Sequence, residues 1–471
     1  MVKIIMTPSQ KDAVNAKSEH VLVRGIPGSG KTFVLANKVR SLILENPNAK
    51  ILFITYNNTL KNYIASTLEE FECNLDNLQI STYHSWARSA LTTVGVKVNN
   101  SFGAIDKVYN EAFEEIEKRY GSSHYFFKPN GKYASPYKSF FKEEAAWLKG
   151  KGLVTREKYL AEKREGRGVG LKARERNIIY DYVELVNKKL KDNGLMDNDD
   201  IGNVVIEHMS KIKKEFVYDS IFIDEAQDLT QMQVKSLSEL LQKGQLCIAA
   251  DLGQKIYKTD YTWVSAGVNV RGGRIKTLDI AHRSTKEIMN LASSLLKHDP
   301  LIKQDDDLRE YEVHSSGIKP VVLKVTEGYE TDAISELVET LMEEDPDYKI
   351  GILALSNDDV KKIAYHVGNN VSTTVTIIDK KGGDLRSPGA KVMTMHGAKG
   401  LEFDIVIIAG MNNRYPMLWN CPKDEEQERI ATGRRLLYVS MTRAKEELYL
   451  VYRGKPTIYL SEMDNNLFEH K

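Results

Sequence analysis

The segment 25–32 is a glycine-rich loop that could hold phosphate groups. It reads Gly-Ile-Pro-Gly-Ser-Gly-Lys-Thr and fits the phosphate-loop pattern GxxxxGK[ST] in full. In such a loop, backbone N–H groups point at phosphate oxygens, and the following helix adds its positive N-terminal end. Lys31 would reach the β- and γ-phosphates, and the Thr32 hydroxyl would bind Mg²⁺. The expected nucleotide contacts are Gly25, Pro27, Gly28, Ser29, Gly30, Lys31 and Thr32.

A pair of acidic residues follows an apolar run further along the chain. Residues 221–228 read IFIDEAQD, so Asp224 and Glu225 directly follow a predicted buried strand. The carboxyl ends of parallel strands are where α/β sheets bind ligands. Asp224 could hold Mg²⁺ through water, and Glu225 could orient or deprotonate the water that attacks the γ-phosphate. Lys31, Asp224 and Glu225 together predict hydrolysis of a nucleoside triphosphate.

These side chains need strands and helices that alternate along the chain. Short β-branched runs predict strands, and the segments between them predict helices, for example Phe33–Leu44 and Thr59–Glu70. Such alternation is typical of parallel sheets covered by helices on both faces, so we predict an α/β protein with two such domains. The predicted strands are His20–Arg24, Lys50–Thr55, Leu78–Tyr83, Ser220–Ile223, Gln245–Ala250, Arg274–Ile280, Pro320–Val325, Ile350–Leu355, Val392–Met395, Ile405–Ile408 and Leu448–Tyr452.

The segment 96–200 interrupts this alternation, because its pattern is mostly helical and richly charged. It predicts a helical insertion, with residues 1–95 and 201–280 forming the first α/β domain and residues 281–471 the second. From Lys142 to Arg176 there are eleven Lys or Arg and six Glu, a local net charge of +5. This stretch could bind nucleic-acid phosphates or could be a solvated helical face, and the sequence favours neither.

The overall composition is that of a globular chain with balanced charge. There are 66 Lys and Arg against 65 Asp and Glu, so a nucleic-acid partner would need a local groove rather than a general basic field. The three cysteines have no metal-binding spacing, and their odd number argues against a disulfide framework, which favours a cytoplasmic location. We find no signal peptide and no apolar run of ~20 residues, so we expect no contact with a membrane.

Further motifs lie in both halves of the chain. They read TPSQ at Thr7–Gln10, STYHS at Ser81–Ser85, ADLGQKIY at Ala250–Tyr257, AHRS at Ala281–Ser284, VMTMHGAKGLEF at Val392–Phe403 and RLLYVSMTRA at Arg435–Ala444. With DEAQD at 224–228, they resemble the motifs of the UvrD/Rep-like group of superfamily 1 helicases, in the same order. The resemblance implies two RecA-like domains that bind ATP and Mg²⁺ between them and a single nucleic-acid strand across their top.

The resemblance implies two contacts with the adenine base. Gln10 would read the adenine edge, although its segment alone could equally be a surface helix start. His282 stands where the family usually has Tyr, and it could still stack on adenine with a smaller ring. Phe33 is a second departure, because an Arg is common at this position in the family, and the resemblance therefore does not carry over the nucleotide contact of that Arg.

The resemblance also implies contacts with the phosphates. Gln254 would sense the γ-phosphate or the attacking water. Arg283 and Arg443 would act in cis as arginine fingers that neutralise charge on the transferring phosphoryl group. Glu402 resembles the family glutamate near the ribose and the metal. Taken singly, each arginine could instead form a surface ion pair, and Glu402 could be a solvated carboxylate.

A single-strand track is also implied, with aromatic side chains that stack on bases beside polar groups that contact the backbone. Aromatic residues at strand ends often pack in a core instead, and this alternative stays open, mainly for Trp86 and Trp263. The predicted nucleic-acid contacts are Tyr56, Asn57, Tyr83, His84, Trp86, Tyr257, Trp263, Thr394 and His396.

We therefore expect an ATP-driven translocase on single-stranded DNA, a 3′→5′ helicase as the family suggests, with RNA as the alternative strand. Only ~110 residues separate Arg283 from Thr394, where larger relatives insert a whole domain, so unwinding by this chain alone is less expected than translocation. The alternative is an ATP-gated nucleic-acid clamp, or a helicase-like subunit that works with a protein partner such as a nuclease in an antiviral defence complex.

Overall fold

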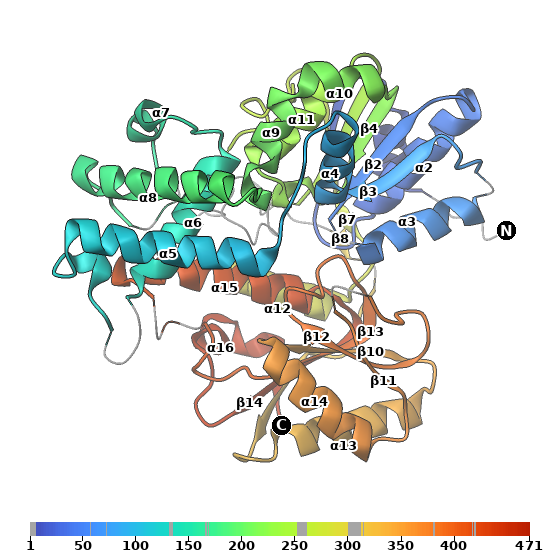
Figure 1. Ribbon diagram of the computed structural model, residues 1–471. Coiled ribbons are helices and arrows are strands. Elements are labelled where there is room, and N and C mark those ends of the chain that lie inside the picture. The colour runs from blue at the N-terminus through green and yellow to red at the C-terminus, as the bar shows by residue number, and fades with distance from the viewer. Residues whose placement is uncertain are drawn as a thin grey trace.

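The computed structural model contains two parallel sheets, each covered by helices, and a helical unit beside the first sheet (Figure 1). The predicted α/β class, with two RecA-like domains and a helical insertion in the first, is therefore confirmed. The structure describes residues 6–56, 58–71, 73–130, 135–164, 167, 169–251, 261–299, 312–313, 315–379, 382–416, 418 and 421–471.

The first sheet has the strand order β3-β2-β4-β5-β1-β6, with every neighbouring pair parallel. Because β1, β5 and β4 are adjacent, the loops that follow them meet at one edge of the sheet. This edge carries the phosphate loop, Asp251 and Asp224. The strands are β1 (His20–Gly25), β2 (Ile51–Thr55), β3 (Leu78–Thr82), β4 (Ser220–Ile223), β5 (Gln245–Ala250) and β6 (Ile275–Leu278).

Helices cover both faces of the first sheet and bury an apolar core on each. On one face lie α1 (Pro8–Asn15), α2 (Lys31–Glu45) and α3 (Asn58–Glu70). On the other face lie α4 (Tyr83–Thr93), α9 (Ile201–Glu207), α10 (Met209–Glu215) and α11 (Gln231–Leu240).

The helical insertion leaves the first domain after α4 and returns at α9. It has its own core, which is rich in aromatic rings such as Phe113 and Phe141, whose ring centres are 5.3 Å apart. Helices α5 and α8 lie side by side along its length (Figure 1). Its elements are α5 (Phe102–Tyr120), η1 (Tyr125–Phe127), α6 (Tyr137–Gly150), α7 (Arg156–Ala161), α8 (Ala173–Asp192) and η2 (Asn198–Asp200).

The second sheet has the strand order β11-β12-β10-β13-β14-β9-β15, again with parallel neighbours. Its strands are β9 (Val321–Val325), β10 (Lys349–Ala354), β11 (Val375–Ile377), β12 (Gly389–Thr394), β13 (Phe403–Ile408), β14 (Ala444–Arg453) and β15 (Glu469–His470). Helices α12 (Lys286–Leu296), α15 (Glu426–Met441) and α16 (Ile458–Glu462) cover one face, and α13 (Glu330–Glu344) and α14 (Asn357–Asn370) cover the other.

Short elements complete the described chain. The two-residue strands β7 (Ile280–Ala281) and β8 (Glu312–Val313) pair in parallel, and α12 lies between them in the sequence. Single helical turns are η3 (Ala226–Asp228), η6 (Lys423–Glu425) and η7 (Asn465–Leu467).

Each strand predicted from the sequence matches an observed strand to within a few residues. The strands that were missed, β7, β8, β11 and β15, are two or three residues long, which is too short to show alternation. Helix α2 begins at Lys31, two residues before the predicted start, because Gly30 ends the loop in a left-handed conformation and the chain turns helical at once.

Candidate active site and strand cavity

The phosphate loop lies between β1 and α2, and it needs glycine at two positions. Gly28 and Gly30 have φ angles of 74° and 84°, which residues with side chains rarely adopt. A Cβ on Gly28 would lie 2.5 Å from the Cβ of Arg283 in the second domain, and one on Gly30 would lie 2.8 Å from Nε2 of Gln10. The loop is therefore packed between helix α1 and the second domain.

The ammonium group of Lys31 lies inside this loop. It donates to the carbonyl oxygens of Gly25 at 2.7 Å and Ile26 at 3.0 Å, and lies 3.3 Å from Oδ2 of Asp251. The nearby hydroxyl of Ser29 is buried and has no hydrogen-bond partner in the described part of the chain. A buried cation beside an unsatisfied hydroxyl suits the oxygens of a nucleotide phosphate.

Thr32 and Asp224 form the candidate magnesium site. The Thr32 hydroxyl donates to Oδ2 of Asp224 at 2.6 Å, so a hydroxyl and a carboxylate converge next to the phosphate loop. Hard oxygen ligands of this kind are those that Mg²⁺ prefers. Burial and the adjacent Glu225 raise the pKa of Asp224 to about 7. A bound cation would offset this cost, so the residues fit the metal.

Glu225 holds an unusual backbone conformation. Its φ is 52°, and among the described residues it is the one non-glycine residue with a positive φ. Such strain persists where the surrounding structure fixes it, often at active sites. The carboxylate accepts a hydrogen bond from the side-chain amide of Gln227. Burial would raise the pKa of Glu225, but the cations of Lys399 and Lys31 outweigh it and keep the pKa below its ordinary value. The carboxyl group of Glu225 is therefore ionised at neutral pH.

Arg283 brings the second domain against the phosphate loop. The preceding residue, His282, donates its backbone N–H to the carbonyl oxygen of Gly28 at 3.0 Å. The Arg283 guanidinium pairs with Glu402, and its Nε is buried without a hydrogen-bond partner among the residues described. Burial would raise the pKa of Glu402, but Arg283 outweighs it and lowers the pKa. Arg283 thus lies at the seam between the domains.

Arg443 lies between α15 and β14 and is 1% exposed. Its Nε donates to the carbonyl oxygen of Val439 at 2.9 Å. Burial and then Arg283 lower the pKa of Arg443 to about 10, while the carboxylates of Glu225 and Glu402 oppose this shift. Since Glu225 belongs to the first domain, the charge of a first-domain carboxylate acts on Arg443 across the seam.

Gln10 lies beside the phosphate loop at the start of α1. Its Oε1 accepts from the backbone N–H of Thr7 at 3.1 Å, which closes a capping box, and its Nε2 donates to the carbonyl oxygen of Ser29 at 3.0 Å. Both ends of the amide are therefore engaged within the chain. Contact with an adenine would need a second hydrogen bond from Nε2 or a rotation of the side chain.

An ion pair joins the two domains behind the acidic motif. Nζ of Lys399 lies 2.5 Å from Oδ2 of Asp228, and the two side chains are 0% and 1% exposed. Nζ also lies 5.6 Å from the ring centre of Tyr56. Sequence reasoning gave no role to Lys399 or Asp251. Their positions inside the AKGLEF and ADLGQ segments were the signal that could have identified them as functional residues.

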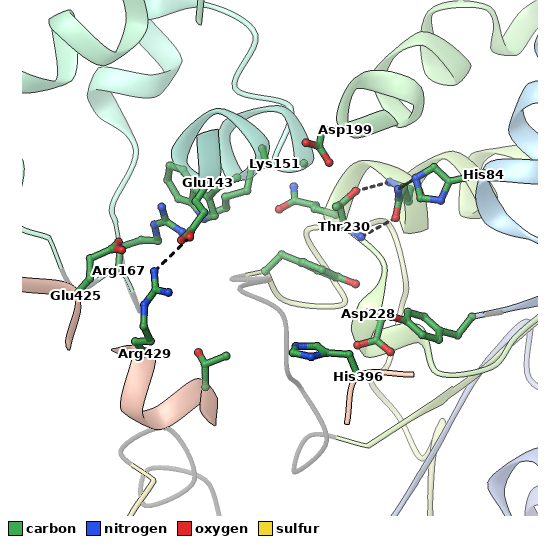
Figure 2. A pocket seen from close by; sticks show the side chains of 18 residues that line it. His84, Glu143, Lys151, Arg167, Asp199, Asp228, Thr230, His396, Glu425 and Arg429 are labelled. Atoms are coloured by element: carbon green, nitrogen blue, oxygen red, sulfur yellow. Dashed lines mark hydrogen bonds and ion pairs between the residues drawn. The ribbon is translucent and has the colours of Figure 1, made fainter. Parts of the chain in front are cut away.

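A cavity of about 540 Å³ lies next to this ion pair, and Asp228 is one of its lining residues. Its walls come from both domains and from the insertion (Figure 2). Of the predicted strand contacts, the structure brings together Tyr56, His84 and His396 here. The other lining residues are Glu143, Ala146, Trp147, Gly150, Lys151, Arg167, Asp199, Asp228, Thr230, Gln231, Gln233, Tyr261, Glu425, Arg429 and Thr432. The cavity is thus enclosed by three separate parts of the chain.

Two of the predicted strand contacts are wrong. Trp86 and Tyr83 are 0% and 1% exposed and belong to the core between the first sheet and α4. The Tyr83 hydroxyl lies 2.7 Å from that of Ser236 in α11. Neither ring can stack on a base, because α4 turns both side chains inward.

The remaining predicted contacts lie outside the cavity or outside the described residues. Trp263 is half-buried and packs edge-on against Tyr261, with ring centres 5.8 Å apart. Thr394 accepts from the backbone N–H of Gly397 at 3.1 Å and does not line the cavity. The predicted contacts Asn57, Gln254 and Tyr257 lie outside the described residues.

No helix in the described ranges combines the length and apolar character that crossing a membrane would require.

Two family models match the chain. The UvrD/REP helicase N-terminal domain matches residues 6–263, which is more than half of the 471 residues. The UvrD-like helicase C-terminal domain matches residues 369–455. The two matches cover the phosphate loop and the acidic motif in the first domain, and the segments that hold Lys399, Glu402 and Arg443 in the second.

Individual relatives match over shorter regions. A probable DNA helicase II homolog from Mycoplasma capricolum is 25% identical over 345 residues, 68% of this chain and 45% of that protein. The ATP-dependent DNA helicase PcrA of Staphylococcus aureus is 36% identical over 93 residues, 17% of this chain and 13% of that protein. The C-terminal domain of a possible DNA helicase from Lactobacillus plantarum has 22% identity and a TM-score of 0.29, over 40% of this chain and 98% of that domain. The matched region thus spans less than half the length of the Mycoplasma and Staphylococcus helicases. On the family matches, the chain belongs to the UvrD/REP helicase family.

Proposed function

We propose that the chain is an ATP-dependent translocase on single-stranded nucleic acid, a 3′→5′ DNA helicase that hydrolyses ATP between its two domains. One observation carries the proposal. Lys31 and Glu225 of the first domain and Arg283 and Arg443 of the second lie at one seam, next to a cavity shared by both domains.

Each residue at the seam has a defined part in binding. Lys31 exchanges its contacts with the Gly25 and Ile26 carbonyls for the phosphate oxygens, and the backbone of the loop supplies further N–H donors. Thr32 and Asp224 would hold Mg²⁺, which supplies charge neutralisation for the phosphates. The site is matched in charge to the nucleotide, because the cations of Lys31, Arg283 and Arg443 would face the negatively charged phosphates.

Hydrolysis needs a base and charge stabilisation. Glu225 is ionised and orients or deprotonates the water that attacks the γ-phosphate. Arg283 and Arg443 neutralise the charge that spreads over the transferring phosphoryl oxygens, an effect worth ~10³–10⁵ in rate. Because both arginines belong to the second domain, full activity requires the domains to close.

Movement along a strand follows from that closure. Tyr56 and His84 line the cavity from the first domain, and His396 lines it from the second. When the two domains close on the nucleotide, the strand contacts of the first domain therefore shift relative to those of the second. The Asp228–Lys399 ion pair lies between the seam and the cavity and transmits the shift.

The test is an ATPase titration with single-stranded DNA, single-stranded RNA and duplex in parallel. We expect strong stimulation by single strands, and loss of activity in Lys31→Ala and Glu225→Gln. The exposed Lys243→Ala serves as the matched control for charge removal. Turnover that is indifferent to every polynucleotide would overturn the proposal.

Strand displacement on tailed duplexes separates the proposed function from its alternative. Displacement from a 3′ tail but not from a 5′ tail supports the 3′→5′ helicase. ATP-dependent binding of the strand without displacement of either duplex supports the ATP-gated clamp, or a subunit that needs a partner such as a nuclease.

A further inference from the structure

The charges of the basic stretch Lys142–Arg176 are mostly used inside the insertion. Arg176 donates to three backbone carbonyl oxygens at the end of α7. Five other cations form ion pairs within the insertion or with η2: Lys142 with Asp106, Lys149 with Asp197 and Asp200, Lys151 with Glu162, Arg156 with Asp181 and Glu184, and Arg164 with Glu144. The stretch is therefore not simply a free basic face.

Arg167 differs from these six cations because only part of its guanidinium group is satisfied. One of its nitrogens, Nη2, pairs with Oε2 of Glu144 at 2.5 Å. Its Nε and Nη1 are buried, and within the described chain they have no hydrogen-bond partner. The side chain is 1% exposed and lines the cavity (Figure 2).

Trp147 presents a second unsatisfied donor on the same wall. Its indole Nε1 is buried and likewise lacks a partner in the part of the chain that is described. The Arg167 guanidinium lies 5.4 Å from the ring centre of Trp147, and the Lys151 ammonium lies 5.1 Å from it. Trp147, Lys151 and Arg167 all line the cavity.

Unsatisfied buried donors are costly, and native proteins rarely keep them without a ligand or a function. Guanidinium and indole nitrogens can only donate. The missing partner must therefore supply acceptor oxygens, and the cations of Arg164, Arg167 and Lys151, of which the first two share the single carboxylate of Glu144, favour a partner with a negative charge. A phosphate group has both properties, and Arg matches its oxygens with a planar fork.

We propose that Arg167 and Trp147 bind one backbone phosphate of the nucleic-acid strand that occupies the cavity. This inference rests on the proposed function and assigns the insertion as the third wall of the strand site. Tyr56, His84 and His396 contact the strand from the two α/β domains, and the insertion holds its backbone from the opposite side.

Carboxylates of the second domain are the competing partner. Glu425 and Glu428 interact electrostatically with Arg167, and Glu425 lines the same cavity. If Glu425 were the natural partner of Arg167, the Glu425→Gln substitution would weaken the closed arrangement and would not tighten strand binding. If a phosphate is the partner, the same substitution removes a repelling charge, and strand binding tightens a few-fold.

The experiment measures binding of fluorescent oligo(dT) of about 20 nucleotides by anisotropy, across a range of NaCl concentrations. We expect Arg167→Gln to weaken binding about ten-fold and to reduce the slope of log K against log[salt] by about 0.7. Trp147→Phe, which keeps the ring and removes the N–H, should weaken binding about three-fold with no change in slope. Lys158→Gln removes an exposed charge from the same insertion and should change the affinity by less than about two-fold and leave the slope unchanged.

Folding of the variants is checked by thermal melting. Arg167→Gln leaves Glu144 with both of its bonds to Arg164, at 2.9 and 2.8 Å, so the insertion should fold. Should it not, Trp147→Phe decides the question. Wild-type affinity and slope in Trp147→Phe and Arg167→Gln would overturn the inference and leave the proposed function standing. A wild-type protein that binds no strand would overturn both.

Discussion

Lys399 and Asp228 lie on different domains, yet their side chains form a fully buried ion pair with an Nζ–Oδ2 distance of 2.5 Å. Asp228 lies three residues after Glu225, and Lys399 lies 5.6 Å from the ring centre of Tyr56 in the cavity. One ion pair therefore connects the acidic motif of the candidate nucleotide site with the wall of the cavity that we propose for the strand. This contact gives the two sites a direct physical link.

The first prediction concerns this link. Breaking a buried pair by removing one partner costs ~3–5 kcal/mol, because the other charge stays buried without compensation. We expect Lys399→Met and Asp228→Asn each to lower the melting temperature and the stimulation of ATPase by single strands. The double variant should lose less than the sum of the single variants, which thermal melting and ATPase titration measure. Additive losses would show that the two residues act independently.

The second prediction contrasts a core aromatic residue with a cavity aromatic residue. Trp86→Ala should lower the free energy of unfolding by ~3–5 kcal/mol and leave the strand affinity of the folded protein unchanged, because the ring is in the core. Tyr56→Leu should weaken strand binding by ~1–3 kcal/mol, since a ring that stacks on a base is lost. Urea unfolding and anisotropy give the two quantities. Weaker binding by folded Trp86→Ala would contradict its assignment to the core.

The third prediction concerns acid stability of the insertion. Burial would raise the pKa of Glu144, but Arg167 and Arg164 outweigh it and lower the pKa to about 2. A carboxyl group with a lowered pKa stabilises the fold above its unfolded pKa, and that stability is lost as the pH falls from about 4.5 towards 2. Glu144→Gln should therefore be less stable than wild type at pH 7, and the difference should shrink over this range. A difference independent of pH in urea unfolding would contradict the assignment.

The grouping of residues at the candidate nucleotide site could be predicted from the sequence because its parts are local. Lys31 and Thr32 lie within one eight-residue pattern, and Asp224 and Glu225 follow a strand directly. The strand order then brings the two segments together, because the carboxyl ends of the parallel strands β4, β5 and β1 meet at one edge of the sheet. The Asp228–Lys399 pair could not be predicted in this way, since no local pattern specifies which residue meets Asp228 across 171 positions of sequence.

Whether an aromatic side chain points into the core or towards the cavity depends on which face of its helix it occupies. Tyr83, Trp86, Ala87, Ala90 and Leu91 are spaced as one apolar stripe, and all five are buried in α4. This spacing was the signal that could have identified Trp86 as a core residue. In the stretch Lys142–Arg176 no such signal existed, because the partners of its eleven basic residues depend on how the helices of the insertion pack.

The fourth prediction separates catalysis from nucleotide binding. Arg443→Gln should reduce kcat by ~10³ with little change in the KM for ATP, since an arginine finger acts on the transition state. Arg453→Gln is the matched control, because Arg453 pairs with Glu327 and Glu330 on the second domain, away from the seam. Steady-state ATPase assays with saturating oligo(dT) give both constants. A raised KM with normal kcat would mean that Arg443 only binds the nucleotide.

The central claim is that Lys31 from one domain and Arg283 and Arg443 from the other act on one phosphoryl group. The most direct measurement is a structure of the protein with ADP, aluminium fluoride, Mg²⁺ and oligo(dT). We expect nitrogen atoms of all three side chains at about 3 Å from the fluoride or phosphate oxygens. Guanidinium groups of Arg283 and Arg443 that stay with Glu402 and Val439, turned away from the fluoride, would contradict it.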